Sequence, residues 1–271
     1  MIGTSYGAIS VLNAIPCGIG ATIGISLQTR VQFIPGTDET QINILNGQGI
    51  DDRLVRICVE RTLKEIAEDP DVNYELTVRS HIPPSRGLKS SSSVCNATIS
   101  AVLNHYRVRM EPMDMLRIGV ECAKEAGVTV TGAFDDTCGC HFGGLVITDN
   151  TKNELLYRDD IPDYDVILWI PENTIPKNKV PVDAYRSRRA EFEEVLALVK
   201  EKPLEALTEN GRLVSEIIGS DTTIVDLALS NGALAAGISG TGPAISIVTE
   251  CGKGRRMADI IGGNTILAVT K

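Results

Sequence analysis

Hydrophobic and polar positions follow two different periods in the first half of the chain. The segments 21–33 and 74–81 alternate, in part or throughout, and are rich in β-branched residues, so each predicts a β-strand. In 51–68 apolar residues recur every three or four positions, which predicts an amphipathic helix that Asp69-Pro70 ends. The same criteria predict further elements, namely helices over 94–103 and 112–126, a short helix before Gly143, and strands over 145–148 and 165–170.

Helical spacing dominates the second half of the chain. Helices are predicted near 182–200, 203–218 and 221–236, with a final strand near 244–249. A strand-rich half followed by a helix-rich half predicts an α+β protein with two lobes. We place the boundary near 150–165 and expect domains at 1–155 and 156–271.

The first 29 residues carry no charged side chain. A signal peptide or a membrane segment is one explanation. However, no Lys or Arg precedes the apolar stretch, and several glycines, Asn13 and Pro16 interrupt it. Short buried strands joined by glycine-rich turns explain it better, so we expect a soluble cytoplasmic protein that makes no contact with a membrane.

Composition narrows the functional classes. With 271 residues and 43% hydrophobic content, the chain can build one large core or two modest ones. Its net charge of -9 argues against a surface that binds nucleic acid without sequence preference, because such a surface needs a basic patch. An anionic substrate would therefore need local cations, a metal ion or backbone N–H groups. The seven scattered cysteines are typical of a reducing cytosol.

A serine-rich loop lies between the strand 74–81 and the apolar helix that follows it. It reads Pro83-Pro84-Ser85-Arg86-Gly87-Leu88-Lys89-Ser90-Ser91-Ser92-Ser93. Glycine permits close backbone approach, and a helix N-terminus offers unpaired N–H groups and a positive dipole end to a phosphate. Arg86 and Lys89 add cations. The alternative is a capped turn that binds nothing; the G-x-x-x-x-G-K-[ST] motif of P-loop proteins is absent from the sequence.

Two further segments carry candidate chemistry. Asp135 and Asp136 are adjacent in a glycine-flanked segment, and phosphoryl transfer to a hydroxyl often uses a carboxylate near that hydroxyl. Helix capping is the alternative for both aspartates. The second segment is the glycine-rich run 236–244, which by itself is typical of a tight connection between a helix and a strand.

In this order, the three segments resemble the motifs of the GHMP kinases, which include galactokinase, homoserine kinase and mevalonate kinase. The pattern P-x-x-x-G-L-x-S-S-S before an apolar helix is similar to their ATP-phosphate motif, and S-G-T-G-P is similar to their third motif. Most of the superfamily has a small residue where this chain has Lys89. The forms G-L-K-S-S-S and T-V-T-G-A-F-D-D resemble those of archaeal shikimate kinases.

The resemblance implies roles for individual residues. Mevalonate-type kinases carry a catalytic aspartate seven residues before a Gly-Gly pair and a Mg²⁺-binding glutamate eleven residues earlier, which correspond to Asp136 and Glu125. Asp136 is then the base or the residue that orients the hydroxyl, with Asp135 in reserve, and Glu125 and Ser91 are Mg²⁺ ligands. Residues 83–93 would bind ATP. The loop near phosphates and substrate would consist of Ser239, Gly240, Thr241 and Gly242.

Two residues are weaker candidates for substrate contact. Asn13 lies in a segment similar to the first GHMP motif, where substrate is contacted, and it could equally be a turn residue. Arg186 belongs to the basic cluster 185–189 and would suit a substrate carboxylate. For that cluster we favour the alternative, a solvated helix face paired with glutamates.

The resemblance implies a fold and an activity. The fold is that of the GHMP kinases, with an N-terminal lobe like the second domain of certain ribosomal and elongation-factor proteins and a ferredoxin-like C-terminal lobe. The activity is phosphorylation of shikimate at its 3-hydroxyl, with ATP and Mg²⁺. The alternatives are a GHMP kinase for homoserine or mevalonate and a non-catalytic binding module. The sequence does not indicate an oligomeric state.

Overall fold

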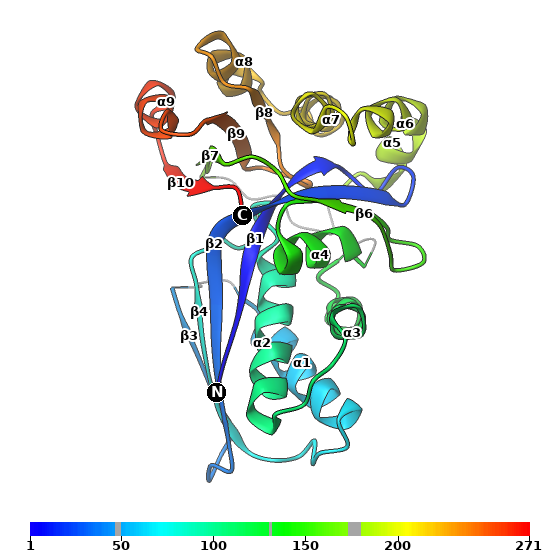
Figure 1. Ribbon diagram of the computed structural model, residues 1–271, viewed down its shortest axis with the longest axis vertical. Coiled ribbons are helices and arrows are strands. Elements are labelled where there is room, and N and C mark those ends of the chain that lie inside the picture. Colours follow the sequence, from blue (N-terminus) through cyan, green and yellow to red (C-terminus); the bar gives the residue numbers. More distant parts are fainter. Residues whose placement is uncertain (47–49, 130–131, 173–179) are drawn as a thin grey trace.

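Two β-sheets and the helices packed on them make up the molecule (Figure 1). The computed structural model describes residues 1–46, 50–129, 132–172 and 180–271. In this part of the chain the first sheet contains β1 (Ile2–Leu12), β2 (Ile19–Pro35), β3 (Gln41–Leu45), β4 (Tyr74–Ser80), β5 (Leu145–Asp149) and β6 (Glu154–Asp159).

The long strand β2 organises the first sheet. It pairs with β1 along one side, while β4 and β5 follow one another along its other side. β3 extends the sheet beyond β4 and β6 extends it beyond β5; the β3–β4 pair is parallel and the other pairs are antiparallel. Because β2 contacts three strands, it connects the two halves of the lobe.

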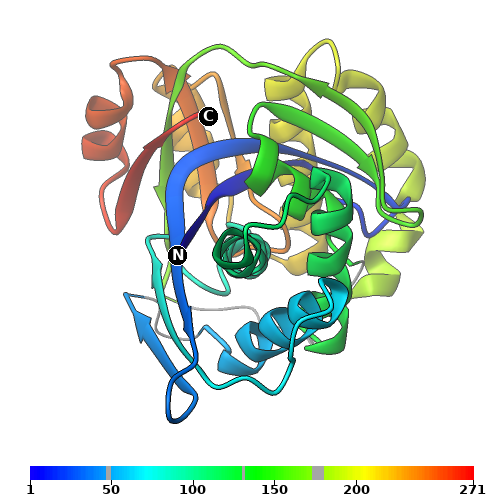
Figure 2. The same cartoon turned by 60° about the horizontal axis from the view of Figure 1, so that its bottom comes forward.

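Within the described residues, the helices that cover this sheet are α1 (Asp52–Glu65), α2 (Ser90–Tyr106), α3 (Pro112–Glu125) and α4 (Phe134–Phe142). α2 runs through the middle of the lobe and is seen almost end-on in Figure 2. A Cβ on Gly3 would lie 2.0 Å from the carbonyl oxygen of Ala97, so only glycine lets β1 approach this helix so closely. The buried apolar residues of α2 thereby pack directly on β1 and β2 and fix where its N-terminus lies.

The second sheet has the strand order β10-β7-β9-β8 and is antiparallel throughout. Its strands are β7 (Tyr164–Trp169), β8 (Ala235–Ile238), β9 (Ile245–Glu250) and β10 (Thr265–Val269), and its helices are α5 (Val182–Ser187), α6 (Arg189–Leu198), α7 (Pro203–Ile218), α8 (Thr223–Ser230) and α9 (Gly254–Ile261). Counting each run of helices as one unit, the order is β-α-β-β-α-β, which is the ferredoxin-like arrangement. The α+β class and the ferredoxin-like C-terminal lobe are therefore confirmed.

Several predicted elements differ from the structure. The helix over 182–200 is interrupted at Arg188, whose φ of -100° and ψ of 18° are not helical. The helix over 221–236 ends at Ser230, because Gly232 turns the chain with a φ of +90° into β8. The strand near 244–249 is followed by α9 and β10, which the pattern did not predict. β3 and β6 were missed as well, since their exposed residues outnumber their buried ones.

The change of sheet falls later than the expected domain boundary at 155/156. β6 still belongs to the first sheet, and the second sheet begins with β7 at Tyr164. One hydrophobic core runs through both lobes, since it contains Ile9 and Ile147 from the first sheet and Ile167 from the second. Among the described residues, no helix combines the length and the apolar character needed to cross a lipid bilayer.

Candidate active site

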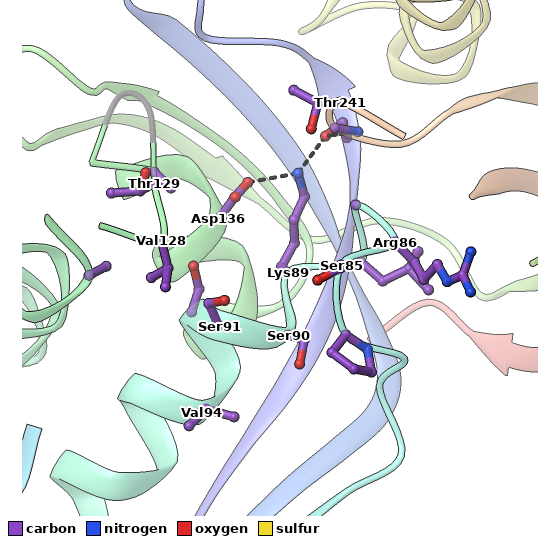
Figure 3. A pocket seen from close by; sticks show the side chains of 18 of the residues that line it. Ser85, Arg86, Lys89, Ser90, Ser91, Val94, Val128, Thr129, Asp136 and Thr241 are labelled. Carbon is purple, nitrogen blue, oxygen red and sulfur yellow. Dashed lines mark hydrogen bonds and ion pairs between the residues drawn. The ribbon is translucent and has the colours of Figure 1, made fainter. Parts of the chain in front are cut away.

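A cavity of about 250 Å³ lies where the N-terminus of α2 meets the end of β1, the start of α4 and the 239–242 loop (Figure 3). The predicted segments thus converge from four distant parts of the sequence. The described residues that line the cavity include Ser10, Asn13, Asp51, Leu54, Pro84, Ser85, Arg86, Gly87, Leu88, Lys89, Ser90, Ser91, Ser92, Val94, Val128, Thr129, Asp135, Asp136, Gly240 and Thr241.

The N-terminus of α2 opens into this cavity. Lys89 is the N-cap residue, in the left-handed conformation (φ 66°, ψ 28°), and its carbonyl accepts the first helical hydrogen bond from the N–H of Ser93, at 3.0 Å. The N–H groups of the first helical residues have no carbonyl partner within the helix. Ser90, Ser91 and Ser92 all line the cavity, so these groups and the positive end of the helix dipole are directed toward it. Of the predicted ATP-binding run, Pro83 and Ser93 do not line the cavity.

Lys89 and Asp136 form a largely buried ion pair beside the helix terminus. The Nζ atom of Lys89 lies 2.8 Å from Oδ1 of Asp136, and their side chains are 5% and 20% exposed. Nζ also donates to the hydroxyl oxygen of Ser10, at 2.7 Å. Burial alone lowers the pKa of Lys89, but the carboxylates of Asp136 and Asp135 outweigh this effect and the pKa is raised. Lys89 is therefore a fixed cation within the site.

Asp135 has different surroundings from its neighbour. Its Oδ1 accepts from the side-chain amide of Asn150 at 2.7 Å, and its backbone N–H donates to Oδ1 of the same Asn150 at 3.0 Å. A Cβ on Gly20 would lie 2.4 Å from Oδ2, so glycine there leaves room for this carboxylate. Burial, reinforced by the charge of Asp136, raises the pKa of Asp135 to about 6. Asp135 therefore anchors α4 to the sheet, and Asp136 is the better placed of the two for chemistry.

The 239–242 loop is held to the first lobe by buried hydrogen bonds. The N–H of Gly240 donates to Oγ of Ser10 at 2.9 Å, and the N–H of Ser10 donates to Oγ of Ser239 at 3.1 Å. The Ser239 hydroxyl in turn donates to the carbonyl of Gly87 at 2.8 Å. Gly240 and Thr241 line the cavity, whereas Ser239 and Gly242 do not. Ser239 thus acts as a connector between the loops.

Asn13 lies in the cavity wall, with both ends of its side-chain amide engaged by the protein. Its Nδ2 donates to the carbonyl of Gly240 at 3.1 Å, and its Oδ1 accepts from the N–H of Ile15 at 2.9 Å. Asn13 therefore shapes the turn after β1 and supports the 239–242 loop. These bonds support the turn role of Asn13, and its contact with substrate stays a prediction.

Sequence reasoning missed Ser10 and Asn210. Oδ1 of Asn210 on α7 accepts from the N–H of Asn13 at 2.8 Å. Neither residue stands in a motif of its own, and their importance follows from contacts with residues about 200 or more positions away. The only usable signal was that Ser10 is a polar residue within an apolar strand pattern.

Two predicted site residues lie away from the cavity. Glu125, the last residue of α3, accepts a charged hydrogen bond from Arg61 on α1 at 2.6 Å and does not line the cavity. The structure therefore does not bring Glu125 to the cavity, and its assignment as a Mg²⁺ ligand, which came from a spacing of eleven residues, stays a prediction. Arg186 is 67% exposed beside Asp183 on α5 and does not line the cavity, so its contact with substrate also stays a prediction. Arg188 and Arg189, which belong to the same basic cluster 185–189, pair with glutamates. This is the arrangement that the sequence favoured for the cluster.

The guanidinium group of Arg86 is directed away from the Lys89–Asp136 pair (Figure 3). It donates to the carbonyl of Pro171 at 2.5 Å and to that of Glu172 at 3.2 Å. Arg86 therefore ties the serine-rich loop to the chain that leaves β7. Val130 and Thr131, part of the run that resembles archaeal shikimate kinases, lie outside the described residues.

The donor set of the cavity limits how Mg²⁺ could be held. Mg²⁺ usually keeps several waters and binds substrate phosphates together with one or two protein groups. Within the described chain no group of three His, Cys, Asp or Glu residues could hold a metal ion. The oxygen groups that line the cavity, among them the hydroxyl of Ser91 and the carboxylates of Asp135 and Asp136, are of the kind that Mg²⁺ binds together with substrate phosphates.

The fold is that of the GHMP kinases. Residues 53–144 match the family description "GHMP kinases N terminal domain", and residues 195–261 match "GHMP kinases C terminal". Mevalonate kinase from Methanococcus jannaschii superposes with a TM-score of 0.80 over 100% of this chain and 98% of its own, at 18% identity. Mevalonate kinase from L. major gives 0.80 over 100% and 96%, at 16% identity. At such low identity, these structures establish the fold alone.

Similarity to curated proteins assigns the chain to a narrower family within the GHMP kinases. It is 38% identical over 272 residues to a shikimate kinase from Methanothrix thermoacetophila, covering 99% of this chain and 93% of that protein. It is 34% identical to the shikimate kinase from Pyrococcus furiosus, covering 92% and 91%. The chain therefore belongs to the shikimate kinase family within the GHMP kinases, which confirms the resemblance drawn from the sequence.

Proposed function

We propose that the protein transfers the γ-phosphate of ATP to the 3-hydroxyl of shikimate, giving shikimate 3-phosphate and ADP. The observation that carries this proposal is the near full-length similarity to shikimate kinases, at 38% identity over 99% of the chain. The geometry supports it, because one cavity combines a helix N-terminus suited to phosphates with a carboxylate suited to a hydroxyl.

The phosphates would lie at the N-terminus of α2. There the N–H groups of Ser90, Ser91 and Ser92 and the helix dipole offer positive potential in a chain whose net charge is -9. A Mg²⁺ ion bound with ATP would neutralise phosphate charge as the transfer proceeds, and Ser91 would be its protein ligand. Backbone groups at a helix terminus are already oriented before the reaction, so they cost no reorganisation during it.

The acceptor would lie between Asp136 and the 239–242 loop. Its hydroxyl donates a hydrogen bond to the Asp136 carboxylate, which orients the oxygen for attack on the γ-phosphorus. As the new O–P bond forms and the bond to the ADP oxygen breaks, the hydroxyl proton passes to Asp136. Gly240 and Thr241, which line the cavity, would limit the access of water to the phosphoryl group that is transferred.

Two further features belong to this proposal. We place the domain boundary in residues 160–163, between β6 and β7, because the chain changes sheet there. We also place the enzyme in the cytoplasm. In support, all seven cysteines are in the described part of the chain and are free, as is typical of a reducing compartment.

The test is ADP release from Mg-ATP by the purified protein, with shikimate, homoserine and mevalonate assayed in parallel. Turnover with shikimate alone is the expected result. Turnover with homoserine or mevalonate instead would support the mechanism of phosphoryl transfer and would reject shikimate as the substrate. A folded protein that binds ATP but phosphorylates none of the three would instead favour a non-catalytic binding module.

A further inference from the structure

Lys89 occupies a position where a phosphate-binding lysine is expected, but its ammonium group is engaged elsewhere. It caps the helix that would receive the phosphates, with its backbone in the left-handed conformation. From there the side chain reaches into the protein, where it is only 5% exposed and ends at Asp136 and Ser10. Figure 3 shows the contact with Asp136 as a dashed line from the Lys89 nitrogen.

The two contacts of this nitrogen join separate parts of the site. Asp136 belongs to α4, and Ser10 belongs to β1 and accepts the N–H of Gly240. A Cβ on Gly240 would lie 3.2 Å from Nζ, so the ammonium packs against the backbone of the 239–242 loop. One positive charge therefore fixes the carboxylate proposed to receive the proton and also supports the loop that covers the acceptor.

The same contacts leave Lys89 poorly placed to hold phosphate. Its charge is already neutralised at 2.8 Å by Asp136, and its ammonium group ends between Asp136 and Ser10 rather than at the N–H groups of the helix terminus. Because Lys89 bonds to Oδ1 of Asp136, we expect the acceptor hydroxyl at the other oxygen, Oδ2. An unrestrained carboxylate would sample several rotamers, whereas a buried charged hydrogen bond selects one.

We propose that Lys89 is a positioning residue for the phosphoryl transfer, which orients Asp136 toward the acceptor and supports the 239–242 loop, and that it is not a ligand of the nucleotide phosphates. This inference rests on the proposed function, since it assigns Asp136 to the acceptor hydroxyl.

Two substitutions separate these roles. Lys89→Met keeps a long side chain without the charge, and Lys89→Gly suits the left-handed backbone while leaving the side-chain space empty. We expect each to lower kcat by about 100-fold, while the Kd for ATP, measured by titration, changes by less than roughly threefold. A phosphate ligand would behave in the opposite way. A Kd for ATP raised about tenfold, with kcat near normal at saturating ATP, would overturn the proposal.

Chemical rescue tests whether the charge itself is needed. Butylammonium added to Lys89→Gly can occupy the vacated space, and we expect it to raise kcat by about tenfold, whereas 1-butanol, of similar shape and without charge, should not. Equal effects of the two compounds, or no effect of either, would contradict the positioning role. Lys64→Met is the matched control, because Lys64 is 60% exposed and pairs with Glu60 at the surface, so its kinetics should match the wild type.

The ATP titration keeps this proposal separate from the proposed function. It requires no acceptor, and circular dichroism can confirm that each variant is folded. A wild-type protein that binds ATP without phosphorylating shikimate would reject the proposed function. The comparison of Kd values between wild type and Lys89→Met would still decide whether Lys89 holds phosphate.

Discussion

Two adjacent aspartates acquire different properties because they point to different sides of the start of α4. Both line the cavity, but Asp136 is partly exposed and pairs with Lys89, while Asp135 is buried and is held by Asn150. Local sequence offers no means of telling them apart, since both are close to the N-terminus of the same helix, where either could cap it. The difference arises from tertiary contacts, and it leads to separate predictions for the two residues.

Asp136→Asn should reduce turnover with little effect on nucleotide binding. The amide keeps the shape of the side chain but cannot take the hydroxyl proton, so we expect kcat to fall by about two to four orders of magnitude. ATP contacts the helix terminus in this scheme, so its Kd should stay close to the wild-type value. Steady-state kinetics with shikimate and an ATP titration measure both quantities. Near-normal turnover would show that another group receives the proton.

Asp135→Asn should change how stability depends on pH. The pKa of Asp135 is about 6 in the folded protein against an ordinary value of 3.8, so ionisation costs more in the folded state. Its favourable contribution to the free energy of unfolding is complete below pH 3.8 and is lost as the pH rises through about 6. Asparagine keeps the hydrogen bond from Asn150 without this loss. The Tm of the variant minus that of the wild type should therefore increase between pH 5 and pH 7.5. A difference that stays constant would show that burial does not raise the pKa of Asp135 in the folded protein.

Glu125→Gln tests whether Glu125 acts as a ligand of Mg²⁺. Its carboxylate pairs with Arg61 at the surface, where such an ion pair contributes less than about 1 kcal/mol. We therefore expect kcat and its dependence on Mg²⁺ concentration to stay near wild type. A kcat reduced about 100-fold, with a requirement for more Mg²⁺, would identify Glu125 as a metal ligand.

At the scale of elements, the serine-rich loop and the 239–242 loop touch through their backbones. Gly87 has a φ of +81°, and a Cβ there would lie 2.0 Å from the carbonyl oxygen of Ser239. The carbonyl of Gly87 also accepts the Ser239 hydroxyl. Glycine is thus required at this contact for two reasons, the backbone conformation and the absence of a side chain.

Gly87→Ala should cost more than the same change at Gly36, which provides a matched control. Gly36 has nearly the same φ, +82°, but nothing lies within 4 Å of a Cβ added there. The strained conformation alone costs of order 1 kcal/mol, and this is the effect expected at Gly36. At Gly87 the clash should add to that cost and displace the two loops, which lowers turnover as well. Urea unfolding and steady-state kinetics of both variants test this, and equal effects at the two glycines would argue against the contact.

The period of the hydrophobic pattern located several elements well and the start of α2 less well. β2, β4 and α7 were predicted close to their observed bounds, because each buries a regular set of apolar residues, whereas the helix predicted over 94–103 begins at Ser90. β3 and β6 expose too many side chains to show such a pattern, and α9 and β10 were not predicted at all. The motifs located the helix terminus and Asp136. The direction of Lys89, the position of Glu125 and the role of Ser10 depend on tertiary contacts that spacing cannot supply.

At the scale of the whole molecule, the site lies where the two lobes meet. One of the two hydrophobic core clusters among the described residues contains residues of both sheets, and α7 of the second lobe packs on β1 of the first. The buried bonds from Ser10 to Ser239 and from Asn13 to Asn210 cross the same junction. The lobes should therefore lose their structure together rather than one after the other.

The single tryptophan makes this cooperativity measurable. Trp169 lies at the end of β7 in the second lobe, whereas the nucleotide would bind mainly at α2 in the first. Urea unfolding followed by Trp169 fluorescence and by far-UV circular dichroism should give coincident midpoints. ATP at about 100 times its Kd should raise the free energy of unfolding reported by Trp169 by about 2.7 kcal/mol, as for a ligand that binds only the folded protein. A tryptophan transition that separates from the circular dichroism signal, or that does not respond to ATP, would show that the lobes unfold independently and that the shared core does not couple them.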